Sequence, residues 1–319
     1  MDRIESMGIF AKVVAKQSFS GAARELRLSQ AAVSKHVRAL EDWLGVQLLN
    51  RTTRRLNVTE IGSLVHERCE RILDEIDEVQ QSTSALQTAP RGVLRLAAPV
   101  SFGTTQLGPA LADYLSRYPE VVVDATLDDR FVDLVEQGFD LALRVGTLND
   151  SSLITRRLAP VRFVLCASRS YVKQNGAPRQ PDDLSDHRCL FYSLRRTPGE
   201  WRFVGPEGEV AWRISGRFRS NNGNMLYEAL LAGAGIGLAP TFVAGRDLAE
   251  GRLVSLMPDY RPVESALSAI YLPGKNLSAK VRSVIDFLAD RFGPEPPWDE
   301  WRQTGQAQAH DAVGRDRGR

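Results

Sequence analysis

The sequence has little cysteine and histidine, and it lacks any long run of apolar residues. Its 319 residues include three cysteines and four histidines, which are scattered and form neither a disulfide framework nor a metal-binding CxxC pair. No stretch approaches the roughly 20 apolar residues of a membrane-spanning helix, and the N-terminus has no signal-peptide apolar core. These absences predict a cytoplasmic protein that uses no metal and no other cofactor.

The sequence also lacks the motifs by which catalytic sites are recognised. It has no HExxH, no GxSxG and no cluster of metal ligands, and the glycine-rich stretch Ala232–Gly237 lacks the lysine of a phosphate-binding loop. Cys166 and Cys189 lie in apolar runs without a neighbouring base or lysine that would activate a thiol. We therefore expect no catalytic residues, and an enzymatic body remains an unfavoured alternative.

The small net charge conceals an uneven distribution along the chain. The whole chain carries +2, whereas residues 1–58 hold ten Lys and Arg against five Asp and Glu. This N-terminal region is therefore +5 and the rest of the chain −3. A basic module joined to a mildly acidic body predicts that the N-terminal end binds a polyanion such as double-stranded DNA.

Three short helices are predicted in the basic region. Apolar residues recur at helical spacing over residues 3–15, Ser18 can cap a second helix, and Ser29 can cap a third that ends at Gly45. The last two helices form a helix-turn-helix over about residues 19–38. The third helix has an apolar stripe on one face, and its other face carries the small, polar and basic side chains that suit the major groove. These predicted DNA-contacting residues are Ser29, Gln30, Ala31, Ser34, Lys35 and Arg38.

Two short strands are predicted next, near residues 46–49 and 56–58, with an arginine-rich tip between them. This pattern indicates a wing whose arginines contact flanking phosphates or a narrow minor groove. Residues 1–59 are thus predicted to form a winged helix-turn-helix domain that binds DNA. The predicted contacts at the wing are Arg51, Thr52, Thr53, Arg54 and Arg55.

A long helix is predicted over residues 60–89, where apolar residues follow alternating steps of four and three. The spacing predicts a coiled-coil linker that makes a homodimer, because duplex operators favour two readers held at a fixed separation. The alternative is an amphipathic helix packed on its own chain. The predicted dimer contacts are Val65, Cys69, Ile72, Ile76, Val79 and Leu86.

Strand and helix patterns alternate from about residue 90 onward, which indicates an α/β body. A last helix is expected at 278–291, and the proline-rich and then polar residues 293–319 are predicted to be a disordered tail. The strands are expected near 93–99, 121–127, 140–145, 162–168, 188–192, 201–204, 210–220, 236–239, 253–257 and 266–271.

An ordered series of residues in the first 62 positions matches a known pattern: Phe10, Val13, Ser18-Phe19-Ser20, Ala22-Ala23, Leu26, Ser29-Gln30-Ala31-Ala32-Val33-Ser34, Leu40-Glu41, Leu44-Gly45, Leu48-Leu49, Arg51-Thr52, Thr59 and Gly62. The body adds the segments Ala98–Gly103, Asp140–Gly146 and Ala232–Pro240. Together these residues resemble the LysR-type transcriptional regulators. Leu49 departs from the family, which usually has phenylalanine there, and an apolar exchange of this kind is expected to alter packing alone.

The resemblance implies that residues 90–292 form an effector-binding domain that resembles a type 2 periplasmic binding protein. Two α/β subdomains would flank a ligand cleft, with subdomain I formed by 91–160 and 266–291 and subdomain II by 161–265. The two crossover segments would lie near Pro160 and Ser265. The resemblance also implies that dimers pair again into tetramers.

The cleft is expected to bind a small-molecule effector. Ser101 follows a strand and precedes a helix, a place suited to anions, and the family uses this position for effector contact. Arg144 lies in an apolar strand and needs a partner, which either an effector carboxylate or Asp140 could supply. A plain capping role is the alternative for Ser101 and for residues 220–222. The predicted effector contacts are Pro99, Val100, Ser101, Phe102, Gly103, Arg144, Ser220, Asn221 and Asn222.

The sequence as a whole predicts a homo-oligomeric transcription factor that binds operator DNA and responds to a small molecule. The effector is predicted to carry a carboxylate, with aromatic compounds left open. Its binding would shift the two subdomains and change either DNA bending or contact with RNA polymerase. The alternative is a ligand-independent DNA-architecture protein, whose binding would show little sequence preference.

Overall fold

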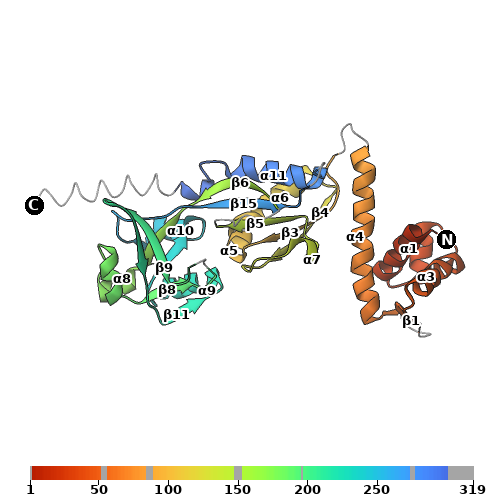
Figure 1. Cartoon of the computed structure of the whole chain (residues 1–319), viewed down its shortest axis with the longest axis horizontal. Helices are drawn as coiled ribbons and strands as arrows, with labels where there is room; N and C mark the ends of the chain where they lie inside the picture. Colours follow the sequence, from red (N-terminus) through yellow and green to blue (C-terminus); the bar gives the residue numbers. More distant parts are fainter. Residues whose placement is uncertain are drawn as a thin grey trace, which may run out of the picture. The chain divides into compact units, whose positions relative to one another are not determined.

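The computed structural model describes residues 2–51, 56–83, 89–146, 153–194, 197–273 and 277–300. The chain divides into two compact units, Met1–Thr88 and Ala89–Arg319 (Figure 1). Each unit has a hydrophobic core of its own. None of the helices in these ranges is both long enough and apolar enough to cross a membrane.

The first unit consists of packed helices and a two-stranded ribbon. Asp2, Ser18 and Ser29 each accept a hydrogen bond from a backbone N–H in the first turn of the helix that follows, so these helices begin at capped ends. Residues in the left-handed conformation, Gln17 and Gly45 among them, end the helices. The elements are α1 (Arg3–Lys16), α2 (Phe19–Leu26), α3 (Gln30–Leu44), β1 (Leu49–Arg51), β2 (Leu56–Val58) and α4 (Glu60–Thr83).

Helix α4 packs against α1 and completes the core of this unit. Cys69 is buried in that core beside Phe10, Val65 packs against it, and the His66 ring meets the Phe10 ring edge-on. Cys69 was predicted to lie at the dimer contact, and this prediction is wrong because the residue is enclosed by its own unit. The apolar side chains that α4 exposes include Ile61, Leu64 and Ile72.

Subdomain I of the second unit is built on a mixed sheet with the strand order β4-β3-β5-β15-β6. Its helices cover a core that contains Leu96, Leu141 and Val284. The strands are β3 (Gly92–Ala98), β4 (Val121–Leu127), β5 (Leu141–Val145), β6 (Ile154–Val161) and β15 (Ser265–Tyr271). The helices are α5 (Val100–Phe102), the π-helix η1 (Gly103–Leu107), α6 (Gly108–Arg117), α7 (Leu134–Gln137) and α11 (Ala279–Phe292).

Subdomain II has a second five-stranded sheet, with the order β11-β8-β12-β7-β13, and a smaller antiparallel sheet, β10-β9-β14. The strands are β7 (Phe163–Ser168), β8 (Cys189–Tyr192), β9 (Glu200–Gly205), β10 (Gly208–Arg213), β11 (Phe218–Ser220), β12 (Ile236–Pro240), β13 (Leu253–Ser255) and β14 (Arg261–Pro262). The helices are α8 (Arg169–Asn175), the 3-10 helix η2 (Pro181–Asp186), α9 (Gly223–Leu231) and α10 (Thr241–Ala249).

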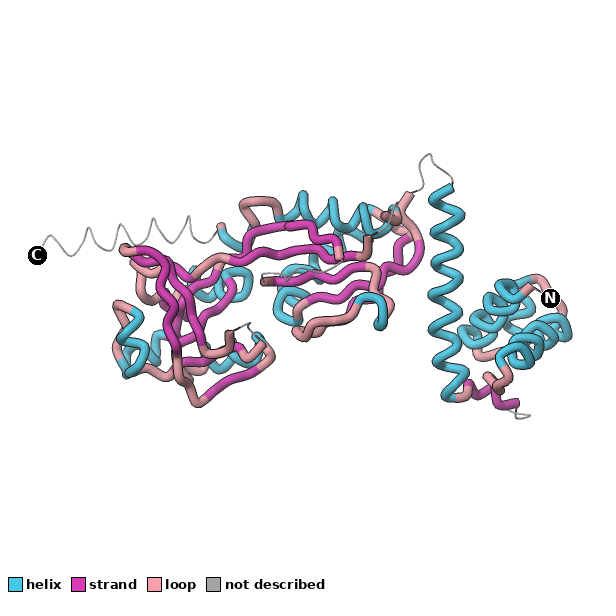
Figure 2. The backbone as a smooth tube through the Cα atoms, in the orientation of Figure 1, coloured by secondary structure: helices cyan, strands magenta, loops and turns pink. Residues whose placement is uncertain are grey.

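Two crossovers connect the subdomains. Strand β6 passes through Arg162 into β7, and β14 returns through Val263 and Glu264 into β15 (Figure 2). The crossovers run side by side because Val161 and Ser265 are paired in the antiparallel β6–β15 ladder. We refer to this double connection as the hinge between the subdomains.

Two sequence predictions for the second unit differ from the structure. The strand expected over 210–220 is two strands, β10 and β11. Residues 293–300 were predicted to belong to a disordered tail, yet a 3-10 helix, η3 (Pro297–Asp299), packs Trp298 and Asp299 into the body. Residues 301–319 lie outside the described residues.

Candidate functional site

Helix α3 presents a polar face and buries an apolar one. Val33, Val37 and Leu40 are fully buried, whereas the polar face points to solvent. The hydroxyl of Ser29 accepts a hydrogen bond from the Ala32 amide at 3.1 Å and so fixes the beginning of the helix. Of the predicted DNA contacts on this helix, Ser34 is half-buried and the others are exposed: Ser29, Gln30, Ala31, Lys35 and Arg38.

Hydrogen bonds fix the base of the wing to the end of α3 and the start of α4. The Glu41 carboxylate accepts from the amides of Leu48 and Leu49, at 2.9 and 3.2 Å. The Thr59 hydroxyl donates to the Gln47 carbonyl and accepts from the Gly62 amide, each at 2.8 Å. The ribbon is thereby held in a fixed position relative to α3. Its last described residue before the tip is Arg51. The predicted wing contacts Thr52, Thr53, Arg54 and Arg55 lie outside the described residues.

An ion-pair cluster joins α1 to α2 on the same unit. Glu25 lies between Lys12 and Lys16, at 2.8 and 2.7 Å. Hydrogen bonds from these lysines lower the pKa of the Glu25 carboxyl to about 2, so it is ionised throughout the physiological range. The cluster joins α1 to α2, the helix that precedes α3.

Ser101 lies where the two subdomains of the effector domain meet. It is half-buried in α5, which follows the carboxyl end of β3. A Cβ atom at Gly223, the first residue of α9 in subdomain II, would come within 2.6 Å of the Ser101 hydroxyl oxygen. Glycine at this position therefore allows the two elements to approach closely across the cleft.

The predicted residues 220–222 lie in subdomain II, at the end of β11 and before α9. Asn222 caps α9, since its side-chain oxygen accepts a hydrogen bond from the Met225 amide at 2.9 Å. The Asn222 amide in turn donates to the Ser220 hydroxyl at 3.0 Å. The structure thus places Ser101 opposite the capped start of α9, near Ser220 and Asn222.

Arg144 contacts the loop after β4. Its guanidinium donates to the backbone carbonyls of Asp129 and Arg130 and lies over the Phe131 ring, 5.4 Å from the centroid. The residue is only 9% exposed, and burial lowers its pKa, an effect that nearby Asp128, Tyr192 and Asp129 oppose. The backbone carbonyls of this loop are therefore hydrogen-bond partners of the buried Arg144 guanidinium.

Asp140, one of the two alternative partners of Arg144, has other contacts in the structure. The Asp140 carboxylate accepts a hydrogen bond from the Arg95 amide at 2.8 Å and lies 3.4 Å from the Lys280 ammonium. Asp140 therefore helps to hold α11 against subdomain I through its contact with Lys280.

Asp129 and Tyr192 are cleft residues that sequence reasoning missed. The Asp129 carboxylate accepts from the Val100 amide at 2.9 Å and forms a hydrogen bond with the Tyr192 side chain from subdomain II. Burial and the neighbouring Asp129 raise the pKa of Tyr192 well above its ordinary value. Their place in the sequence could have indicated them, because Tyr192 ends a strand and Asp129 closely follows one. Ligands of open α/β sheets bind at the carboxyl ends of strands.

Phe102 does not face the cleft. Its side chain is fully buried and meets the rings of Phe242, Phe292 and Trp298 at centroid distances of 5.5, 5.5 and 6.0 Å. The prediction that it contacts the effector is wrong for its side chain, because the aromatic core of subdomain I encloses it. Gly103 is also buried, whereas Pro99 and Val100 are half-buried.

The described ranges contain no group of three or more His, Cys, Asp or Glu side chains that could hold a metal ion. The three cysteines are free and buried. Burial raises the pKa of Cys166 and of Cys189 to about 12 and also raises that of Cys69.

Comparison with known proteins identifies both units. Residues 4–63 match the family model "Bacterial regulatory helix-turn-helix protein, lysR family", and residues 87–293 match "LysR substrate binding domain". The HTH-type transcriptional activator AaeR of Escherichia coli K12 is 38% identical over 294 residues, which cover 92% of this chain and 94% of the relative. The regulator DmlR of the same organism is 35% identical, over 92% of this chain and 96% of its own.

Solved structures agree with this assignment. CrgA, a LysR-type regulator from Neisseria meningitidis, is 33% identical with a TM-score of 0.60, covering 91% of this chain and 98% of its own. The virulence activator AphB of Vibrio cholerae is 26% identical with a TM-score of 0.57, covering 91% and 99%. The chain therefore belongs to the LysR family of DNA-binding transcriptional regulators, with an N-terminal helix-turn-helix and a C-terminal effector-binding domain.

Proposed function

We propose that this regulator binds a discrete operator as a homodimer, with α3 in the major groove, the wing on the flanking backbone, and a small organic acid in the cleft as the signal. The observation that carries the DNA-binding part is the exposed polar and basic face of α3 on a helix whose other face is buried. Lys35 and Arg38 are the side chains proposed to read base edges.

The proposed dimer contact is the outer face of α4. Val65 and Cys69 pack inside their own unit, and the same helix also exposes the apolar side chains Ile61, Leu64 and Ile72. Exposed apolar side chains gathered on one helix gain stability when another chain covers them. We therefore shift the proposed contact from Val65 and Cys69 to these exposed side chains and retain Ile72 and Ile76. Leu86 lies outside the described residues, as does the environment of Val79. A pairing of dimers into tetramers is proposed from the family resemblance alone.

The effector is proposed to bind beside Ser101 and the start of α9, which approach too closely for a ligand to lie between them. The Ser101 hydroxyl, the start of α9 and the Arg144 guanidinium would suit a ligand with a carboxylate and further hydrogen-bonding groups. The Asp129 carboxylate already accepts a hydrogen bond from the Val100 amide, so an anionic ligand would have to displace this carboxylate or bind away from it. We propose that its binding changes the subdomain arrangement, and with it DNA bending or contact with RNA polymerase. No catalytic group and no cofactor is proposed.

The test is to incubate the purified full-length protein with sheared genomic DNA at physiological salt and to sequence what it retains. We expect a small set of partly palindromic sites. Retention without sequence preference would overturn the proposal in favour of an architectural role.

Two variants and a matched control sharpen this test. Lys35→Ala and Arg38→Ala should change which sites are retained, by about tenfold or more at the affected base position, since a base contact is worth about 1–3 kcal/mol. Lys173→Ala removes an exposed lysine from α8 in the other unit and should leave the retained sites unchanged. Uniform weakening at every site would assign Lys35 or Arg38 to phosphate contact.

A further inference from the structure

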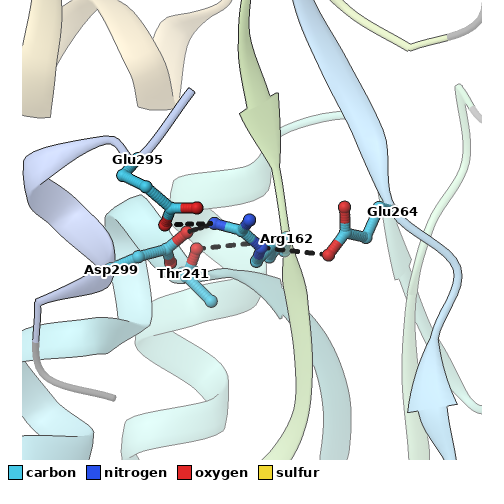
Figure 3. Close-up of polar contacts among 5 residues, drawn as sticks. All are labelled: Arg162, Thr241, Glu264, Glu295 and Asp299. Atoms are coloured by element: carbon cyan, nitrogen blue, oxygen red, sulfur yellow. Dashed lines mark hydrogen bonds and ion pairs between the residues drawn. The ribbon is translucent and has the colours of Figure 1, made fainter. Parts of the chain in front are cut away.

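Arg162 connects both crossovers of the hinge to the C-terminal segment (Figure 3). Its guanidinium donates to Glu264 of the second crossover at 3.0 Å and to Asp299 at 2.6 Å, and Glu295 lies 3.8 Å away. Its backbone carbonyl accepts from the amide and hydroxyl of Thr241, at 2.9 and 3.2 Å. One residue in the first crossover therefore contacts the second crossover, the start of α10 and the C-terminal segment.

The same C-terminal segment also reaches the back of the effector cleft. Trp298, next to Asp299, packs edge-on against Phe102, and Phe102 directly follows Ser101. Phe242, which follows Thr241, completes the contact at centroid distances of 5.5 Å from Phe102 and 5.9 Å from Trp298. Two adjacent residues, Trp298 and Asp299, thus connect α5 to the hinge.

Trp298 and Asp299 are buried, but each has a polar atom whose hydrogen-bonding capacity is unused among the described residues. Asp299 is 7% exposed and Trp298 is 8% exposed. Asp299 Oδ1 and Trp298 Nε1 have no hydrogen-bond partner among the described residues. An unsatisfied buried polar group opposes the packing in which it lies, so these two atoms weaken the hold of the segment on the body.

A groove of about 440 Å³ lies beside the crossovers, and its lining includes Pro160, Arg162, Glu264 and Pro294. Both crossovers and the C-terminal segment form its walls, so a change in the angle between the subdomains would change its width and the contacts of Arg162.

We propose that residues 294–299 form a strap that couples the effector cleft to the hinge, with Trp298 positioning α5 and the Asp299–Arg162 ion pair positioning the crossovers. A ligand that moves Ser101 and α5 would move Trp298, and the adjacent Asp299 would pass that movement to both crossovers. Asp299 and Arg162 are positioning residues, because the proposal has them act through the crossovers and not on the ligand. The biological meaning of the strap rests on the proposed effector site.

Amide hydrogen exchange of the full-length protein, followed by mass spectrometry, tests the strap without DNA or effector. Asp299→Asn keeps the shape of the side chain and removes its charge. We expect exchange to become roughly tenfold faster in the crossovers, residues 158–166 and 260–268, and also in α5 and η1, while β12 is unchanged. Asp286→Asn breaks a different Arg–Asp pair, with Arg156, and should leave all of these regions at the wild-type rate.

A second variant separates the strap from the hinge itself. Glu264→Gln removes the link between Arg162 and the second crossover but leaves the strap in place. It should speed exchange in the crossovers and leave α5 unchanged. The proposal is overturned if Asp299→Asn affects only residues 294–300, if it speeds β12 equally, or if Glu264→Gln also speeds α5. Each of these failures would leave the proposed effector and DNA-binding functions untouched.

Discussion

Ser29 has two possible roles, as a helix cap and as a DNA contact, and these can be separated. Ser29→Ala removes the acceptor of the Ala32 amide and should lower the free energy of unfolding by about 1 kcal/mol, measured by denaturation followed by circular dichroism. Ser29→Asn restores a capping oxygen and should recover most of that loss. Ser63→Ala, at an exposed position inside α4, serves as a control and should be neutral or slightly stabilising. Equal stability of Ser29→Ala and the wild type would show that the cap contributes nothing.

Cys166 and Cys189 are predicted to be inert in the folded protein. Burial raises the pKa of each thiol from 9.0 to about 12, so the reactive thiolate is about a thousandfold rarer at pH 8 than for an unperturbed thiol. Alkylation by iodoacetamide, followed by mass spectrometry, should therefore be slow under native conditions and fast in denaturant. Rapid native labelling of either cysteine would show that its thiol is accessible and ionised in the folded protein.

At the residue scale, the sequence predicted what depends on local chemistry and failed where a partner is distant in sequence. The capping roles of Ser18 and Ser29 follow from residue type and from the helix pattern after them. The partners of Arg144 do not, because they are backbone carbonyls of the loop after β4, which residue type does not reveal. The side chain of Phe102 was misplaced because its contacts, Phe242, Phe292 and Trp298, come from three segments that only the fold brings together.

Helix α4 is the element on which oligomerisation is expected to depend. Leu64 is 58% exposed on the face that the core of its own unit does not use. Leu64→Glu should weaken or abolish the dimer, because a charge would be buried at an apolar seam, and light scattering after size exclusion would show a lower mass. Ser63→Glu introduces the same charge one position earlier, at an exposed site, and should leave the mass unchanged. An unchanged mass for Leu64→Glu would place the dimer contact elsewhere.

Elements with a regular pattern were predicted closely, and those that break the pattern were missed. Strand β4 has the predicted bounds, whereas β6 was missed because Arg156, Arg157 and Pro160 interrupt its apolar pattern. The sheet order explains why such residues are tolerated, since β6 is an edge strand. The prolines of the segment after α11 suggested disorder, yet Trp298 has apolar partners that hold the segment in place.

At the scale of the whole molecule, subdomain II is an insertion between two strands of subdomain I. The chain leaves at Val161 and returns at Ser265, and these residues are neighbours in the β6–β15 ladder. The core of subdomain I also contains Val284, Leu288 and Phe292 from α11 and Trp298 beyond it. The early part of that subdomain therefore depends on residues near the end of the described chain.

This arrangement sets an order for folding during synthesis. The DNA-binding unit and subdomain II are each contiguous and can fold as they leave the ribosome, whereas subdomain I must wait for the last helix and Trp298. A chain that stops before α11 would thus carry a finished DNA-reading head on an unfinished sensor. Premature termination late in the gene would yield a protein that still occupies operators but no longer responds to its signal.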